Sequence, residues 1–95
     1  MYIRVVRAQT QPGQVEELAQ RWKAFLGPRF GSLPGFRHAY FGANREANTT
    51  VAVSVWDQRP DPATLEPVVE EFRAQVTDIS AGAPVFEEYE MLGDF

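Results

Sequence analysis

The chain has 95 residues, of which 44% are hydrophobic and 13% are aromatic, and it contains no cysteine. A chain of this length supports one thin core, so we expect residues 1–95 to form a single domain. The lack of cysteine excludes disulfides, thiol nucleophiles and cysteine-ligated metal sites within the chain. The formal net charge of −4 at pH 7 provides no broad positive field. This charge disfavours nucleic acid and anionic membranes as partners.

The beginning of the chain enters a predicted strand at Tyr2. It shows no charged segment followed by an apolar segment and a small-residue cleavage site. No apolar run in the chain reaches the length of a membrane span. We therefore expect a cytoplasmic protein.

The first half of the chain predicts a strand, a helix and a second strand. Residues 2–9 mix β-branched and long side chains, and a Pro-Gly turn then breaks the run. Apolar residues next recur every three or four positions, which indicates one face of a helix. They are Val15, Leu18, Ala19, Trp22, Phe25 and Leu26. This helix is expected to end near Gly27 and Pro28, and residues 36–41 form the second predicted strand.

The second half predicts a third strand, a second helix and a last strand. A polar reversal over residues 42–48 leads into a strand over residues 49–56. A second helical stripe contains Leu65, Val68, Val69, Phe72, Val76 and Ile79. Thr64 is a candidate N-cap, which would place Pro67 in the first turn, where its missing N–H is harmless. Residues 85–92 form the fourth predicted strand.

The element order β-α-β-β-α-β predicts an α+β, ferredoxin-like fold with a four-stranded antiparallel sheet. Each crossover lays its helix on the same side, so both helices should cover one sheet face. Every strand carries apolar or aromatic residues at positions of both parities, which a sheet with one wet face would not show. We therefore expect a homodimer that buries the open sheet face between two chains.

The predicted hairpin gathers candidate site residues on one sheet face. A reversal centred near residue 46 pairs Phe36 with Trp56, His38 with Ser54, and Tyr40 with Ala52. A pocket between this face and the helices would be aromatic with a few polar anchors, which suits a flat organic ligand. His38 beside Ser54 offers a general base and a hydroxyl. The alternative interpretation is a core filled by aromatic rings, with His38 and Ser54 as a half-buried polar pair.

Neither the carboxylates nor the glycines predict a metal or cofactor site. Glu87, Glu88 and Glu90 lie on a predicted outer strand, where charges more often discourage edge-to-edge pairing than bind a hard cation. Asp57 and Asp61 are interpreted as turn and cap residues. The glycines between the first helix and second strand follow a helix, whereas phosphate-binding glycines follow a strand. We therefore expect no metal and no bound cofactor.

Three segments carry a family resemblance through their order and spacing. They are Gln11–Leu18 at the first strand–helix junction, Leu33–Phe36 before the second strand, and Val53–Asp57, which contains Trp56. Together they resemble the antibiotic biosynthesis monooxygenase domains of the dimeric α/β-barrel superfamily. The resemblance implies a homodimer whose sheets form a closed barrel, with the helices outside and a cavity in each subunit. It also implies oxidation of electron-rich phenolic or quinol-type substrates by O2, without metal or flavin.

The chain departs from this family pattern at several positions. Glu70 and Glu71 stand in the region where related domains often have a histidine, which argues against haem ligation. The first strand also lacks the asparagine of the haem-degrading relatives. Ala52 stands where an amide side chain would better suit the oxygenase pattern.

The resemblance and the predicted face together lead to a cofactor-free, monooxygenase-like homodimer acting on a small aromatic substrate. The candidate catalytic residues are His38, Tyr40 and Trp56, and the candidate substrate contacts are Phe36, Ser54, Phe72 and Trp22. A non-catalytic ligand-binding or structural homodimer of the same fold stays open. So does a cofactor-free isomerase or lyase.

Overall fold

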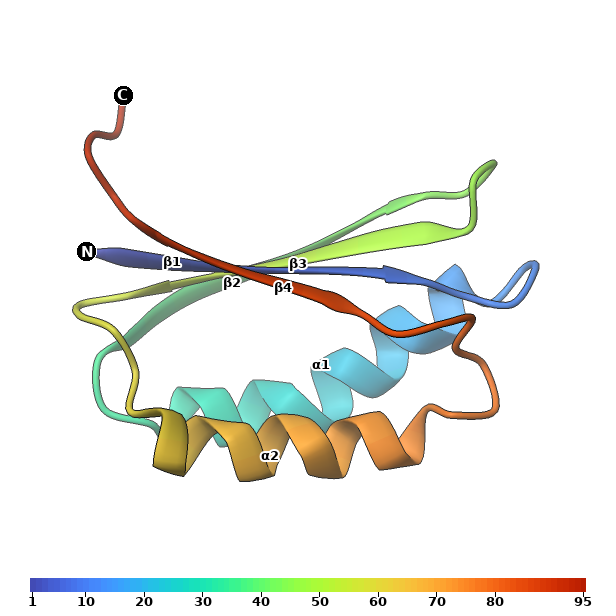
Figure 1. Ribbon diagram of the computed structural model, residues 1–95, viewed down its shortest axis with the longest axis horizontal. Coiled ribbons are helices and arrows are strands. Elements are labelled where there is room, and N and C mark those ends of the chain that lie inside the picture. Colours follow the sequence, from blue (N-terminus) through green and yellow to red (C-terminus); the bar gives the residue numbers. More distant parts are fainter.

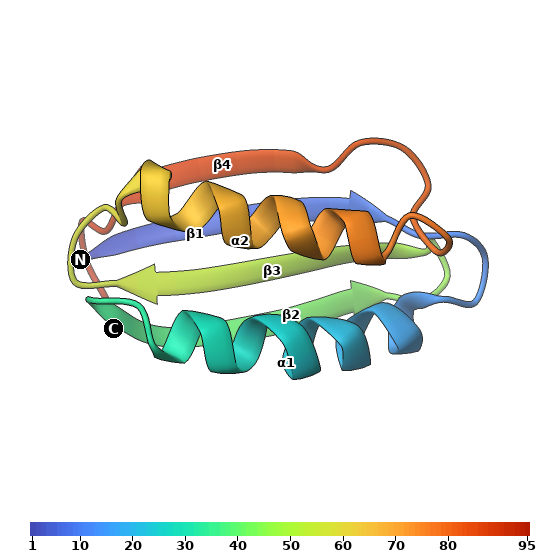
Figure 2. The same cartoon turned by 90° about the horizontal axis from the view of Figure 1, so that it is seen from below.

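The computed structural model describes residues 1–95, the whole chain. Its elements are β1 (Tyr2–Gln9), α1 (Val15–Gly31), β2 (Phe36–Asn44), β3 (Thr49–Trp56), α2 (Pro62–Gln75) and β4 (Val85–Glu90). The strands form one antiparallel sheet in the order β2-β3-β1-β4. Both helices cover the same sheet face and leave the other bare (Figure 1 and Figure 2). The predicted ferredoxin-like architecture is therefore confirmed.

Helix α1 extends beyond the stop that the sequence predicts at Gly27 and Pro28. It ends at Gly31 and contains Pro28. The Phe30 side chain accounts for the extension, because it is buried and its ring centroid lies 5.5 Å from that of Trp56. Burying such a ring contributes about 1.5–3 kcal/mol, which is comparable to the cost of about 3 kcal/mol for an internal proline. Tertiary packing thus offsets the local stop signal.

Helix α2 begins earlier than predicted. Asp61 is its N-cap, and the Asp61 carboxylate accepts a hydrogen bond of 3.0 Å from the backbone N–H of Ala63. The interpretation of Asp61 as a cap residue is confirmed, whereas the assignment of Thr64 as N-cap is wrong. Because the helix starts at Pro62, Pro67 lies in its second turn.

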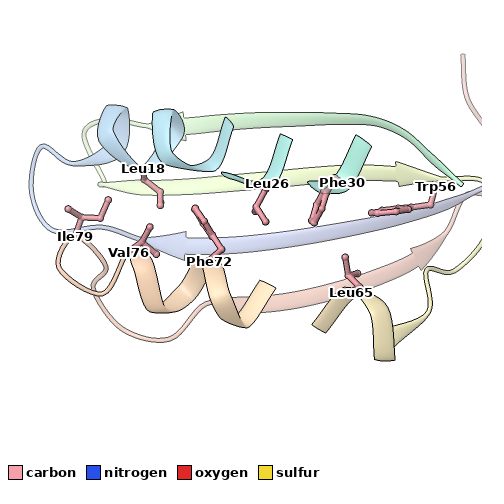
Figure 3. Close-up of a cluster of buried hydrophobic side chains, with 8 residues drawn as sticks. All are labelled: Leu18, Leu26, Phe30, Trp56, Leu65, Phe72, Val76 and Ile79. Atoms are coloured by element: carbon pink, nitrogen blue, oxygen red, sulfur yellow. The ribbon is translucent and has the colours of Figure 1, made fainter. Parts of the chain in front are cut away.

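The core lies between the helices and the helix-facing side of the sheet. Figure 3 shows side chains from both helices meeting above the strands, with Trp56 at one end of the layer and Ile79 at the other. The buried cluster comprises Leu18, Leu26, Phe30, Trp56, Leu65, Phe72, Val76 and Ile79. Val76 and Ile79 follow the last residue of α2, so the predicted apolar stripe continues beyond the end of the helix.

The β2–β3 hairpin contains a β-bulge that changes the predicted register. Phe36 pairs with Trp56 as predicted, but His38 then pairs with Val55 and Tyr40 with Val53. The predicted partners, Ser54 and Ala52, face Ala39 and Phe41 instead. Because successive strand residues point to opposite faces, one extra residue moves His38 and Tyr40 to the face away from the helices.

The bulge has a tertiary cause at Arg37, the residue left without a strand partner. The Arg37 guanidinium Nε donates to the carboxylate of Asp57, just past the end of β3. The backbone N–H of Asp57 in turn donates to the Gly35 carbonyl at 2.8 Å. Gly35 has a φ of +83°, a conformation that favours glycine. These contacts fix both sides of the bulge.

The open face of the sheet is largely aliphatic at its centre. Ile3 and Val5 of β1 lie opposite Val55 and Val53 of β3, all of them half-buried. Tyr40 adds an exposed ring beside Val53, with 63% of its surface accessible. Neither helix is both long and apolar enough to cross a membrane.

Candidate active site in the helix–sheet cavity

A cavity of about 290 Å³ lies between the sheet and the two helices. Its floor consists of helix-facing residues of β1 and β3: Val6, Ala8, Thr50 and Ala52. Its walls include Leu18, Trp22 and Leu26 from α1, Val69, Phe72 and Arg73 from α2, and Phe86 from β4. Most of these side chains are apolar, so the cavity suits a flat hydrophobic ligand of small size.

Small side chains on β3 explain why space exists at this position. The helix-facing residues of β3 run from Thr50 through Ala52 and Ser54 to Trp56. Trp56 fills the layer at one end of the strand and is fully buried. Ala52 lacks the side-chain volume to do the same under the middle of the helices, so the cavity lies above it.

The polar groups of the cavity are few, and only one is charged. Arg73 on α2 is that cation, and hydroxyl groups come from Thr50, Thr77 and Ser80. The Arg73 guanidinium donates to the Glu70 carboxylate at 3.0 Å, and its side chain is 43% exposed. Arg73 therefore lies at the rim of the cavity, where it can attract an anionic group from solvent.

The structure does not bring the predicted site residues together. His38 and Tyr40 lie on the open sheet face, with ring centroids 6.5 Å apart. Trp56 and Ser54 lie on the helix-facing side, so the sheet separates the two groups. The prediction that they share one face is wrong, because of the bulge at Arg37. Their proposed catalytic roles are a separate matter, which no contact in the structure tests.

Trp56 lies in the sealed core and not in the cavity lining. Its indole Nε1–H donates to Ser54 Oγ at 2.9 Å. The rings of Phe30 and Phe36 contact it edge-on, with centroids 5.5 and 5.2 Å away. Phe36 thus packs against Trp56 and, like it, does not line the cavity. Trp22 and Phe72, two of the predicted substrate contacts, do line the cavity.

Sequence reasoning missed Arg73, Phe86 and Val6 as lining residues. Arg73 follows Phe72 and lies four residues after Val69 on α2, so helical spacing could have placed it beside the apolar stripe. Side chains alternate between the two faces along β1 and β4, so the sequence could have assigned Val6 and Phe86 each to a face. That the two residues lie side by side follows only from β1 and β4 being neighbours in the sheet. No three His, Asp or Glu side chains converge to hold a metal ion.

Comparison with known proteins identifies the family. The family model for antibiotic biosynthesis monooxygenase matches residues 1–63. No curated protein matches the sequence. Among solved structures, the chain is similar to the monooxygenase ActVA-Orf6 of Streptomyces coelicolor in complex with the ligand nanaomycin D. The TM-score is 0.79 with 18% identity, over 99% of this chain and 89% of that chain.

Two further structures share the fold. The cofactor-independent oxygenase SnoaB from Streptomyces nogalater gives a TM-score of 0.65 with 19% identity, over 98% of this chain and 94% of that chain. Rv0793 from Mycobacterium tuberculosis gives 0.72 with 16% identity, over 98% and 96% of the two chains. The fold and the family model agree over the strands that form the cavity floor. The chain belongs to the antibiotic biosynthesis monooxygenase family.

Proposed function

We propose that the protein is a cofactor-independent, monooxygenase-like enzyme that oxidises a small phenolic or quinol-type substrate in the helix–sheet cavity. The observation that carries this proposal is the cavity itself: about 290 Å³, mostly apolar, with the single cation Arg73 at its rim. Membership of the antibiotic biosynthesis monooxygenase family supports the reaction class. Two proteins of similar fold, ActVA-Orf6 and SnoaB, are described as a monooxygenase and a cofactor-independent oxygenase.

The proposed chemistry needs only the substrate and O2. Loss of a proton to water at the open rim of the cavity gives an electron-rich aromatic anion. This anion transfers one electron to O2, and the two radicals combine at a ring carbon. The resulting peroxide takes up a proton and loses water, which leaves a ring carbonyl. One oxygen atom enters the product, the other leaves as water, and the substrate supplies all four electrons. Arg73 would favour the anion through its positive charge next to a low-dielectric cavity.

The direct test is O2 consumption by chelator-treated protein with a hydroxyanthrone as probe, corrected for the reaction without protein. We expect quinone formation in equal amount to the O2 consumed. Arg73→Gln should lower kcat/KM by about tenfold. This is less than the roughly hundredfold to thousandfold lost with a water-excluded oxyanion donor, because Arg73 is partly exposed and paired with Glu70. Arg45→Gln, in the turn between β2 and β3, is the matched control and should leave turnover unchanged.

The same assay tests the roles of His38 and Tyr40. Their position on the open sheet face leads us to expect unchanged turnover for His38→Ala and Tyr40→Phe. Loss of turnover in either variant, with cavity binding intact, would restore them as catalytic candidates and would argue against reaction in the helix–sheet cavity.

A second candidate function is ligand binding without chemistry. The residues that line the cavity include no His, Asp, Glu, Lys or Tyr, so no side chain there is suited to take the substrate's proton. Stoichiometric binding of aromatic ligands without O2 consumption would favour this function. Turnover that continues without O2 would instead favour an isomerase or lyase.

We also propose that the active form is a homodimer joined through the open sheet face. Ile3, Val5, Val53 and Val55 form an aliphatic centre that water would cover in a single chain. The last residues leave the sheet on this side, away from the helices (Figure 1). Leu92, in this tail, is 90% exposed. A second copy of the chain would cover both features.

A further inference from the structure

Arg4 is a buried charge that the proposed reaction does not use. It lies on β1, is 8% exposed, and its Nε is buried without a hydrogen-bond partner. Burial lowers the pKa of the guanidinium, and the nearby carboxylates of Glu88 and Glu66 oppose this effect. An unpaired donor on a buried cation costs free energy unless another group compensates it.

The nearest carboxylate compensates Arg4 only in part. Glu88 Oε1 lies 3.7 Å from Arg4 Nε, too far for a hydrogen bond. The other oxygen of Glu88 accepts hydrogen bonds from Arg59 Nε at 3.1 Å and from the Tyr2 hydroxyl at 3.3 Å. One carboxylate therefore faces two arginines, and the guanidinium of Arg4 keeps capacity for a further oxyanion.

The strand register places Arg4 directly beside the cavity floor. Across the sheet, Ala52, Val6 and Phe86 form one row, and all three line the cavity. The next row on the same face consists of Ser54, Arg4 and Glu88. Two residues along a strand span roughly 6.6 Å, so the second row lies about one ring width from the floor.

Two contacts tie this second row to the cavity. The Arg4 guanidinium carbon lies 5.5 Å from the ring centroid of Phe86, a cavity wall that is 41% exposed. Ser54 is 5% exposed and accepts from Trp56, which leaves its own hydroxyl hydrogen free to donate. Arg4 and Ser54 do not line the cavity themselves, but they lie one row beyond its floor, on the side of Trp56.

We propose that Arg4 and Ser54 form an anion subsite at the inner end of the cavity, and that the ligand is a hydroxyaromatic acid bearing a carboxylate. This inference rests on the proposed function and specifies its substrate class. The aromatic body occupies the apolar cavity, the carboxylate accepts from Arg4 and Ser54, and the hydroxyl end points towards Arg73 at the rim. A small shift of the Phe86 ring opens the path between the two rows.

The test compares two probes that share one ring system, 2-naphthol and 6-hydroxy-2-naphthoic acid, by calorimetric titration at pH 7. A carboxylate bound by a buried arginine should make the acid bind about tenfold or more tightly than the neutral probe. Arg4→Gln should abolish this preference and keep the affinity for 2-naphthol. Arg45→Gln, in the turn between β2 and β3 and away from Glu88, is the matched control and should retain the preference. Arg73→Gln, at the rim, should retain it as well.

The outcomes separate this inference from the proposed function. Binding of 2-naphthol with no preference for the acid overturns the subsite and leaves the cavity proposal standing. A preference that disappears only in Arg73→Gln places the carboxylate at the rim and also overturns it. Failure of both probes to bind overturns the cavity proposal, and the subsite with it.

A stability measurement tests the same inference without ligand. A residue retained for packing should lower the midpoint of thermal unfolding when replaced, whereas an undercompensated charge retained for binding should not. We expect Arg4→Met to unfold at the wild-type temperature or above it. If both Arg4→Gln and Arg4→Met fail to fold, Arg4 has a structural role and the subsite is overturned.

Discussion

Trp56 donates from its indole Nε1 to Ser54 Oγ, 2.9 Å away, and both side chains are buried on the helix-facing side of β3. This hydrogen bond joins two successive residues of that face. It therefore lies between the aromatic end of the core and Ala52, which lines the cavity. Trp56 therefore fills the core beyond the end of the cavity and is not part of the cavity lining.

This arrangement predicts that Trp56 mainly determines stability. Trp56→Ala should lower the free energy of unfolding by about 3–5 kcal/mol, because it removes a fully buried ring. Trp56→Phe keeps a ring against Phe30 but removes the hydrogen bond, with a cost of about 1 kcal/mol for that bond and more for the lost volume. Urea unfolding followed by circular dichroism measures both values. A Trp56→Phe protein that is stable but has lost all ligand affinity would contradict this division of roles.

Ala52 should control access to the cavity floor. Ala52→Leu places a larger side chain in the space between the sheet and Phe72, so we expect at least a tenfold loss of affinity for 2-naphthol. Because the added methyl groups enter an existing void, the loss in the free energy of unfolding should stay below the roughly 1–3 kcal/mol that overpacking a filled core costs. Val53→Leu, the next residue but on the open face, is the control and should keep wild-type affinity. Equal affinity in both variants would show that the ligand binds elsewhere.

The open face should determine assembly. Val53→Asp introduces a charge between Val5 and Tyr40, at the centre of the proposed interface, and we expect it to yield a folded single subunit. Sedimentation velocity at micromolar concentration distinguishes this from the wild-type dimer. Ala24→Asp, on the exposed side of α1, adds the same charge and should leave the dimer intact. A wild-type chain that sediments as a single folded subunit would overturn the dimer proposal.

Acid should weaken the contact between α1 and the segment that follows α2, which Arg21 and Asp78 form. The Arg21 guanidinium donates to both carboxylate oxygens of Asp78, at 2.8 and 3.1 Å, and holds the pKa of Asp78 below its ordinary value of 3.8. The unfolded chain thus binds this proton more readily than the folded one. The stabilisation is complete above pH 3.8 and is lost as the pH falls through the lower pKa of the folded state.

Asp78→Asn should therefore flatten the acid side of the stability profile. Urea unfolding at several pH values between 7 and 2 measures this as a smaller loss of stability on acidification than in the wild type. Glu46→Gln, in the turn between β2 and β3, removes one carboxylate elsewhere and is the control. The stability profiles of the wild type and of Asp78→Asn should differ on the acid side by the same amount whether or not both proteins also carry Glu46→Gln. An unchanged acid profile in Asp78→Asn would contradict the proposed role of the Arg21–Asp78 pair.

The ends of an element could be predicted from the sequence where neighbouring residues along the chain determine them. The bounds of β1 and β3 agree with the predicted ranges, since strand periodicity and the flanking turns define them. The end of α1 could not be predicted in the same way, because burial of Phe30 against Trp56 decides it. The bulge at Arg37 has a similar origin in its contact with Asp57, which lies 20 residues away along the chain.

The candidate site was predictable only in its general character. Apolar periodicity placed Trp22 and Phe72 between the helices and the sheet, and both line the cavity. The same reasoning placed His38 and Tyr40 beside them, because the predicted register contained no extra residue. The sequence does not distinguish Arg4 from other surface arginines, since an arginine in a strand is usually solvated. Only its burial and the missing hydrogen-bond partner of its Nε distinguish it in the structure.

The alternation along β3 gives neighbouring residues independent tasks. The odd-numbered positions of β3 face the proposed second subunit: Val51, Val53 and Val55. The even-numbered positions face the helices and the proposed ligand: Thr50, Ala52 and Ser54. A mutation at an odd-numbered position can change dimer affinity while the cavity lining stays the same. A mutation at an even-numbered position can change the shape of the cavity while the dimer interface stays the same. The two sides of this strand can therefore diverge separately, so new substrates could be accommodated by its inner side alone.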